Sequence, residues 1–418
     1  MFVFRGRVPE LLLLLLFSAA ANSQSLTLAE AERLAIAAEP GQAVLLERAS
    51  ALREQAVAAG QLPDPKLRVA LANFPLESGG FSTEGMTQAQ VGLRQAFPPG
   101  NSRAVSSRHY ESMALEFDAS AAARLRDVRA AVRTSWLDAW YWNAARDIVT
   151  AMRPLFGDML KVTESLYSVG RRNQQDVLRA QLELSRLEDR LIDIDQGAAQ
   201  AQARLSEWIG DEARRQIDNE LPAWQPLPPR AQLQQQLRGH PAVQSADARI
   251  TAASDAVELA QQQYKPGWAL DVGYAYRDGR LPNGASRSDF ATVGVTLDLP
   301  YFRGKRQDRQ VAAARGQRRA AAAGREQLLR QLASRLDAGY ARCEQLTRRI
   351  SLYQQQVLPQ AHEHSTAALN AYQSDAADFA DVMRAAVAEL NAQLEAVQLQ
   401  VDRARSYAVV ANLGGIWQ

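Results

Sequence analysis

Cysteine is nearly absent from this chain: Cys343 is the only one among 418 residues. A single thiol cannot form a disulfide within the chain, so no disulfide framework supports the fold. The charges almost balance, because the formal net charge is only +2. Such a balance provides no basic footprint for a nucleic acid, and we expect no nucleic-acid partner.

Histidine is also scarce, with four residues, and this argues against a metal centre. His362 and His364 stand two positions apart, so on a helix their side chains diverge by roughly 200° and cannot share a metal ion. Neither Cys343 nor a carboxylate pair completes a ligand set. The chain has no phosphate-binding loop, no nucleophile elbow and no convincing catalytic triad. The sequence therefore predicts neither an enzyme nor a protein with a cofactor or bound metal.

Long apolar runs are missing after the N-terminus, where no segment approaches the roughly 20 residues of a membrane-spanning helix. The N-terminus, MFVFRGRVPELLLLLLFSAAANSQS, places Arg5 and Arg7 before an apolar run at 11–17, and three alanines follow at 19–21. This pattern predicts a secretory signal peptide over residues 1–23 and therefore an exported mature chain. A buried N-terminal helix is the alternative.

A long internal repeat is the most informative feature that is present. The segment YSVGRRNQQDVLRA at 167–180 corresponds to YQSDAADFADVMRA at 372–385, and Pro154 and Pro359 share the same offset of 205 residues. A repeat of this length is half the protein and not a solenoid module. It predicts a first structural repeat over 24–210, an equatorial connector over 211–240, a second repeat over 241–410 and a C-terminal tail over 411–418.

Each repeat contains one very long predicted helix, at about 101–168 and about 304–373. Pro154 and Pro359 are the only serious breakers in these two segments, and we expect each to kink its helix. At 1.5 Å per residue each helix is roughly 100 Å long. Apolar residues spaced by three and four continue after the predicted tips at 169–175 and 374–377, which indicates coiled-coil packing. A similar series in the second long helix places Cys343 on a packing seam.

Four short segments have the alternation of β-strands, at about 66–75, 87–97, 268–277 and 289–299. In these segments apolar residues alternate with small or polar ones, as in transmembrane β-barrel strands. Surface hairpins on a soluble domain are the alternative. Four strands cannot close a barrel, because the backbone groups of open edges would face lipid without partners. The pattern therefore predicts an oligomer, and a threefold assembly has 12 strands.

The mature chain from Leu26 onward resembles the TolC family of outer-membrane efflux channels. The resemblance rests on the LTLAEAERLA opening, the duplicated strand-hairpin and long-helix halves, and the matched tip segments RPLFGDMLKVTESLYSVGRRNQQDVLRA and LPQAHEHSTAALNAYQSDAADFADVMRA. The segments LPDPKLRVALANFP and EGMTQAQVGLRQAFPPG are most similar to the heavy-metal cation efflux branch.

The resemblance implies a mainly α fold with a small β part. Three protomers would form a 12-stranded outer-membrane β-barrel that continues into a periplasmic α-barrel. The implied partners are two further copies of the chain, outer-membrane lipid, a periplasmic adaptor (membrane fusion) protein and an inner-membrane transporter of the resistance-nodulation-division type. Cys343 lies far from the N-terminus, so we expect no lipid attachment there.

The resemblance also implies a gate where the helix tips meet at the periplasmic entrance. An acidic position repeated around a narrow ring attracts cations, although an aspartate near a helix start also caps free N–H groups. Two departures from the family pattern are Asp375 in place of the usual glycine and Ala377 in place of a basic residue. The candidate gate residues are Asp381, Asp176, Tyr372, Tyr167, Arg384, Arg179 and Asp378. The candidate adaptor contacts are Gly170, Arg171, Arg172, Ser374 and Asp375; a solvated loop is the alternative for the two arginines.

The sequence therefore predicts a trimeric outer-membrane channel of a Gram-negative bacterium that extends into the periplasm. It would be the exit duct of a tripartite pump for heavy-metal cations, opened when an adaptor separates the helix tips. A duct for organic toxins or for type I secretion is one alternative. An exported periplasmic coiled-coil scaffold without a pore is an alternative of another class.

Overall fold

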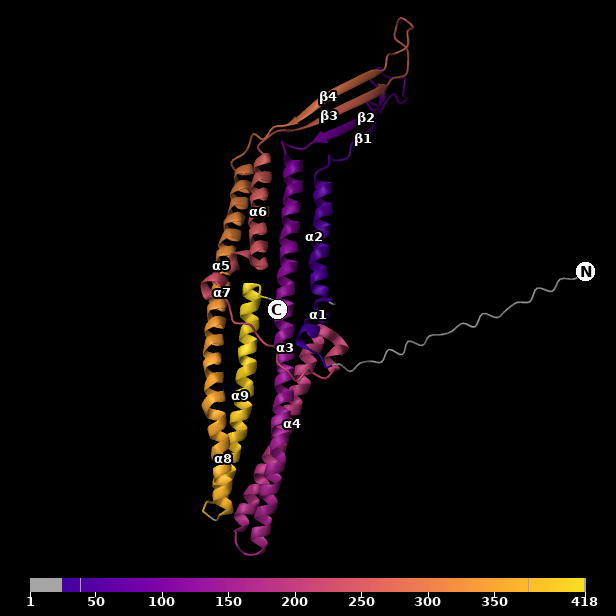
Figure 1. Cartoon of the computed structure of the whole chain (residues 1–418). Coiled ribbons are helices and arrows are strands. Elements are labelled where there is room, and N and C mark those ends of the chain that lie inside the picture. Colours follow the sequence, from indigo (N-terminus) through magenta and orange to yellow (C-terminus); the bar gives the residue numbers. More distant parts are fainter. Residues whose placement is uncertain (1–24, 38, 375, 417–418) are drawn as a thin grey trace, which may run out of the picture.

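The computed structural model describes residues 25–37, 39–374 and 376–416. They form a long rod of helices with a four-stranded sheet at one end and two helix hairpin tips at the other (Figure 1). The predicted signal peptide and Asp375 lie outside the described residues. No helix within these ranges has the length and apolar character needed to cross a membrane.

The element order repeats, as the duplicated tip segments predict. The first half contains α1 (Leu28–Ala37), α2 (Pro40–Ala59), β1 (Lys66–Ala72), β2 (Gln88–Phe97), α3 (Ser102–Ser168) and α4 (Gln174–Ile209). The connector contains η1 (Gly210–Arg214), α5 (Arg230–Gln236) and η2 (Leu237–Gly239). The second half contains α6 (Pro241–Gln262), β3 (Gly267–Tyr276), β4 (Phe290–Asp298), α7 (Gln307–Leu352), η3 (Tyr353–Val357), α8 (Leu358–Gln373) and α9 (Phe379–Gly414).

The two long helices are not equivalent at their prolines. Pro154 lies inside the continuous helix α3. By contrast, a π turn at Tyr353–Val357 divides the other helix, and Pro359 stands in the first turn of α8. Proline has no N–H to donate, so the helix lacks one backbone hydrogen bond at this position. The wider π turn just before Pro359 accommodates this missing bond. The second long helix also begins at Gln307 and not at 304, and α9 extends to Gly414, into the segment predicted as a tail.

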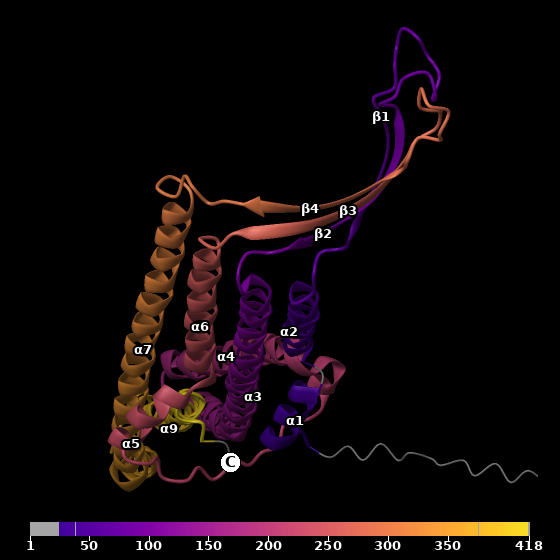
Figure 2. The same cartoon turned by 90° about the horizontal axis from the view of Figure 1, so that it is seen from above.

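The sheet joins the two halves. Its order is β1-β2-β3-β4, and all neighbouring strands are antiparallel. The central pair β2 and β3 is a contact between the repeats, with Gly92 opposite Gly273. Seen from above, the sheet curves away from a row formed by α2, α3, α6 and α7 (Figure 2). The helices therefore begin at one end of the sheet, and neither face of the sheet is covered by a helix.

The N-terminal segment and the connector pack against the middle of the rod. Leu26 pairs with Ile217 as a parallel bridge, and the Trp136 indole N–H donates to the Leu26 carbonyl at 2.9 Å. Arg133 on α3 is fully buried, forms an ion pair with Glu32, and lies over the Trp224 ring of the connector. These contacts anchor both segments to α3.

The predicted coiled-coil seams are buried. On α4 they include Ala180, Leu187, Ile194 and Leu205, and on α9 Met383, Leu390, Val401 and Ala404. Gly197 marks the closest approach on the α3–α4 seam. A Cβ atom at this position would lie 2.4 Å from Cε2 of Trp142, well inside van der Waals contact.

We predict that Gly197→Ala lowers the stability of the protein by about 1–3 kcal/mol, because the partly buried Trp142 ring must move to admit the methyl group. Thermal unfolding of the detergent-solubilised protein, followed by circular dichroism, measures this. Gly157→Ala is the matched control: a Cβ there meets nothing within 4 Å in the described chain. The control should be neutral or stabilising by up to about 1 kcal/mol. Equal behaviour of the two variants would contradict the close contact.

Cys343 lies on the seam between α7 and α9, as predicted, and its side chain is 5% exposed. Burial raises the pKa of this thiol from 9.0 to about 11. Its Sγ faces the Arg403 carbonyl of α9 at 3.8 Å. The position is structural, since a thiol without thiolate character is a poor nucleophile.

We predict that a maleimide labels native Cys343 at pH 8 at least about a hundredfold more slowly than the unfolded chain, because so little thiolate forms. The labelling rate should rise as the pH approaches 11. The double variant Cys343→Ser, Ser334→Cys is the control, because Ser334 is exposed on the same helix. Native and unfolded Cys343 reacting at one rate would refute the burial.

Candidate functional site

The sheet has one apolar face that continues across all four strands. The register places Val69 beside Val91, Leu93 beside Val272, and Val272 beside Val293. Large apolar side chains on this face are exposed, up to 75% for Val69 and 73% for Val293. A contiguous apolar surface of this extent indicates a surface that meets lipid or another protein.

The opposite face is small and polar. Arg68, Arg94 and Asp271 lie there together with Gly92, Gly273 and Thr292, in the register positions between the apolar residues. Arg94 and Asp271 face each other across β2 and β3 at 3.8 Å, and Thr296 donates to Asp271 at 3.1 Å. This alternation of apolar and polar faces is the pattern of a barrel strand with lipid on one side and water on the other.

The sheet has two open edges within the described residues. Strand β1 pairs only with β2, and β4 pairs only with β3. Backbone N–H and C=O groups along an open edge need hydrogen-bond partners wherever water is excluded. In a single copy of this chain, the apolar face therefore favours removal from water, whereas the open edges need water or another strand as a hydrogen-bond partner.

At the far end of the rod, the first tip is a short reversal between α3 and α4. Gly170 has the left-handed backbone angle φ 72°, which favours glycine. Its N–H donates to the Tyr167 carbonyl at 2.9 Å, and the Arg171 N–H donates to the Leu166 carbonyl at 2.9 Å. Arg171 is exposed and Tyr167 is 47% exposed. The tip therefore presents Arg171 and the Tyr167 ring to its surroundings.

The second tip, between α8 and α9, uses a different local structure. The Ala376 N–H donates to the Ala371 carbonyl at 2.8 Å, and the Ser374 hydroxyl donates to the carbonyls of Asn370 and Ala371 at 3.0 and 3.1 Å. Ser374 is exposed, although its hydroxyl is hydrogen-bonded to the last turn of α8. The candidate adaptor contact Asp375 lies outside the described residues.

The candidate aspartates occupy the same position in both copies. Asp176 is the third residue of α4 and Asp381 is the third residue of α9, and the backbone N–H of each donates to the residue three positions earlier, Asn173 or Asp378. Both carboxylates lie in the first turn, where the helix dipole stabilises negative charge. Asp381 is 48% exposed and forms an ion pair with Arg384 one turn later.

The two tips contact each other within one protomer through an interaction that the sequence analysis did not predict. The Arg172 guanidinium of the first tip lies over the Tyr372 ring of α8, 4.8 Å from its centroid. The same ring packs edge-on against the buried Phe379 at 5.6 Å. Arg172 is therefore half-buried and holds the two hairpins together, in contrast to the exposed position expected for it.

Tyr372 is buried beside the second tip. Its side chain is 6% exposed, and its hydroxyl has no hydrogen-bond partner in the described part of the chain. The ring, and not a hydroxyl hydrogen bond, makes the contact seen here. Arg179 is half-buried and Asp378 is exposed as the residue before α9.

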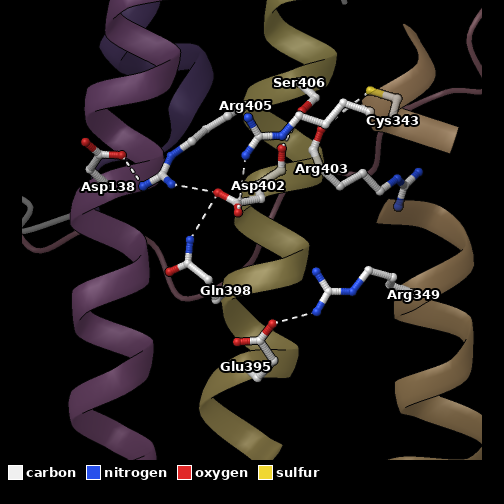
Figure 3. A network of polar contacts seen from close by, with 10 residues as sticks. Asp138, Cys343, Arg349, Glu395, Gln398, Asp402, Arg403, Arg405 and Ser406 are labelled. Atoms are coloured by element: carbon white, nitrogen blue, oxygen red, sulfur yellow. Dashed lines mark hydrogen bonds and ion pairs between the residues drawn. The ribbon is translucent and has the colours of Figure 1, made fainter. Parts of the chain in front are cut away.

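A second polar cluster lies midway along the rod and was not found from the sequence. Arg405 of α9 forms ion pairs with Asp138 of α3 and with Asp402, the latter at 2.9 Å (Figure 3). Arg204 of α4 reaches Asp138 at 3.4 Å, and Arg342 of α7 reaches Asp402 at 3.5 Å. These residues line a groove between the four helices. They are far apart in sequence, so no local spacing indicates the cluster.

We predict that the Arg172–Tyr372 contact contributes about 0.5–2 kcal/mol to the coupling of the two tips. A double-mutant cycle with Arg172→Gln and Tyr372→Leu, read from thermal unfolding, measures it. Arg171→Gln is the matched control, since it removes the same charge from an exposed neighbour. A coupling for Arg172 no larger than that for Arg171 would show that the stacking has no energetic role.

Comparison with known proteins agrees with this geometry. Residues 232–415 match the family model described as Outer membrane efflux protein. No curated protein sequence matches the chain significantly.

Solved structures match over nearly the whole chain. The outer membrane protein VceC from Vibrio cholerae aligns with a TM-score of 0.79 at 19% identity, over 93% of this chain and 96% of that one. The CmeC outer membrane channel of Campylobacter jejuni aligns with a TM-score of 0.76 at 13% identity, over 93% and 85%. CusC, whose structures concern transmembrane channel formation, aligns with a TM-score of 0.73 at 16% identity, over 92% and 91%. Together these matches confirm the mainly helical channel fold.

Proposed function

We propose that the chain, of which residues 232–415 match the outer membrane efflux protein model, belongs to that family, and that three copies of it form one continuous duct. The sheets would combine into a 12-stranded barrel in the outer membrane of a Gram-negative cell. The helices would form a tunnel through the periplasm. The duct would be the exit of a tripartite pump with a periplasmic adaptor protein and an inner-membrane transporter of the resistance-nodulation-division type. The mature chain would carry no lipid anchor.

The four-stranded sheet with an apolar face and two open edges carries this proposal. Pairing of β4 with β1 of the next copy supplies hydrogen-bond partners to both edges, and the apolar face then meets lipid all round. The polar face, with Arg94 and Asp271, lines a water-filled interior. Single-chain barrels begin at eight strands, so one copy with four cannot seal itself.

The two tips of each copy would converge at the periplasmic entrance, six in a trimer. In this arrangement the Arg172–Tyr372 contact makes each protomer's pair of hairpins one unit. Opening then requires movement between protomers, and an adaptor shifts the balance towards the open state by binding it more tightly. The exposed Arg171, Gly170 and Ser374 are the surface that an adaptor hairpin would contact at the tips.

Heavy-metal cations are the cargo that we propose, because the strand segments resemble the heavy-metal branch and because carboxylates repeat at the entrance. Three copies place Asp381 and Asp176 in rings, and such rings favour cations. Arg384 forms an ion pair with Asp381, and Arg179 lies one turn after Asp176. The electrostatic field at the entrance therefore depends on how far these arginines lie from the axis of the channel. A duct for organic toxins or for type I secretion keeps the same barrel and tunnel and differs in the pump it serves.

Extraction and conductance distinguish a channel from a pore-free periplasmic scaffold. A channel requires detergent for release, migrates as a trimer and conducts ions in planar bilayers. A scaffold leaves the cell on osmotic shock, stays soluble in plain buffer and gives no conductance. Growth of a deletion strain on copper, zinc, cobalt and nickel tests the cargo, and wild-type tolerance of all four metals would contradict it.

We predict that Asp381→Ala lowers the cation-to-anion permeability ratio by at least about twofold, because it removes a carboxylate ring and leaves Arg384 unpaired. Single-channel reversal potentials in a salt gradient measure the ratio. Asp158→Ala is the matched control, because Asp158 also forms an ion pair three residues later on a helix surface, with Lys161 at 3.0 Å. An unchanged ratio in Asp381→Ala would remove this residue from the filter.

A further inference from the structure

The junction between β4 and α7 carries a concentration of positive charge that the channel proposal does not use. Arg303, Lys305, Arg306 and Arg309 follow the end of β4 within one short segment, and Lys265 lies at the neighbouring turn between α6 and β3. We call these five residues the basic collar. All five are exposed, and none forms an ion pair with a carboxylate in the described part of the chain.

The collar segment contains one acidic residue, and Asp298 at the end of β4 lies opposite Gly267, two positions after Lys265. Asp308, in the first turn of α7, is the acidic residue inside this segment, and its carboxylate accepts a hydrogen bond from the Tyr264 hydroxyl at 2.5 Å. Arg303 donates to the Pro300 carbonyl at 2.9 Å and lies over the Tyr264 ring. The corresponding junction of the first repeat, between Phe97 and Ser102, contains no charged residue. Arg103 follows at the second position of α3, where it is exposed and reaches the Gly60 carbonyl at 3.4 Å. The second repeat therefore has the greater concentration of cations at this junction.

Exposed apolar side chains stand directly beside the collar. Leu299, Tyr301 and Phe302 are 75%, 83% and 76% exposed. Leu299 directly follows β4, whose odd-numbered residues Val293, Val295 and Leu297 are exposed on the apolar face, and the chain then turns, with the Tyr301 N–H donating to the Leu299 carbonyl at 2.9 Å. In a chain that met only water here, such exposure of aromatic rings would be unfavourable.

The depth of this junction fits a membrane–water interface. At the helix end of the sheet the Trp268 ring stacks on Phe97, while Tyr274 and Tyr276 lie at the other end of β3. Tyr276 follows Trp268 by eight positions, which is roughly 26 Å along a strand and about 20 Å along the membrane normal at the tilt of about 40° that such barrels have. This length is comparable with the apolar band of about 25 Å between the aromatic girdles of outer-membrane barrels. The collar begins just beyond the band, on the side of the helices (Figure 1).

We propose that the basic collar binds the phosphate groups of anionic phospholipids in the membrane leaflet that faces the helical rod, with Tyr301 and Phe302 inserted among the acyl chains. This inference rests on the proposed outer-membrane channel. Exposed arginine and lysine next to interfacial aromatic rings match a lipid surface, because the rings enter the apolar layer and the cations meet the phosphates. Because the cations are concentrated at the junction of the second repeat, we expect one such lipid site per protomer.

The test uses the full-length trimer reconstituted in nanodiscs that contain phosphatidylethanolamine with one fifth phosphatidylglycerol. Native mass spectrometry after gentle detergent transfer counts the phosphatidylglycerol molecules that remain bound. The variant is Lys305→Gln, Arg306→Gln, Arg309→Gln. The matched control is Arg318→Gln, Arg319→Gln, Arg348→Gln, which removes the same charge from exposed positions farther along α7.

Wild type and control should retain phosphatidylglycerol in preference to phosphatidylethanolamine, and the collar variant should lose at least about tenfold of that preference. If all three trimers conduct ions and retain phosphatidylglycerol equally, the lipid-binding proposal is wrong and the channel proposal is unaffected. If the collar variant changes the cation-to-anion permeability ratio and retains lipid as wild type does, the collar lies in the channel lumen. This result would also contradict the lipid-binding proposal. Failure of wild type to form conducting trimers would overturn both proposals.

Discussion

The backbone hydrogen-bonding groups along the free sides of β1 and β4 constrain this molecule more than any other feature. They adjoin an apolar face that has to leave water, and water is the partner they would otherwise use. Neither requirement can be met by one chain with four strands. The same sheet is curved and has a polar face with Arg94 and Asp271, and the helices leave both of its faces uncovered.

Duplication of one hairpin-and-rod unit produces most of the architecture, and the two copies differ where their surroundings differ. Pro154 sits within an unbroken helix, whereas a π turn precedes Pro359. The first tip reverses through Gly170 in a left-handed conformation, while the second tip closes through hydrogen bonds of Ser374 and Ala376. Such differences allow matched helices to keep the same length while they contact different neighbours.

Polar contacts hold the two hairpins of one protomer together at two heights. Midway along the rod, Arg405 joins α9 to α3 through Asp138 (Figure 3), and at the tip Arg172 packs on Tyr372. Between them lies a continuous apolar core that includes Phe156, Leu187 and Leu390. The two hairpins of one protomer are therefore joined by polar contacts at both ends of this core.

The sequence by itself determined the four strands, the two long helices and the helices after their tips, because period-two alternation, period-3.5 spacing and breakers such as Gly170 act over a few residues. The short elements α1, η1, α5 and η2 were not predicted. The sequence also located buried seam positions such as Cys343, since a helix repeats its face regularly. Only the tertiary structure decided that β2 pairs with β3, that Arg172 covers Tyr372 and that Arg405 meets Asp138. These contacts join residues up to 267 positions apart, and local propensity carries no information on which distant side chains meet when the rods pack.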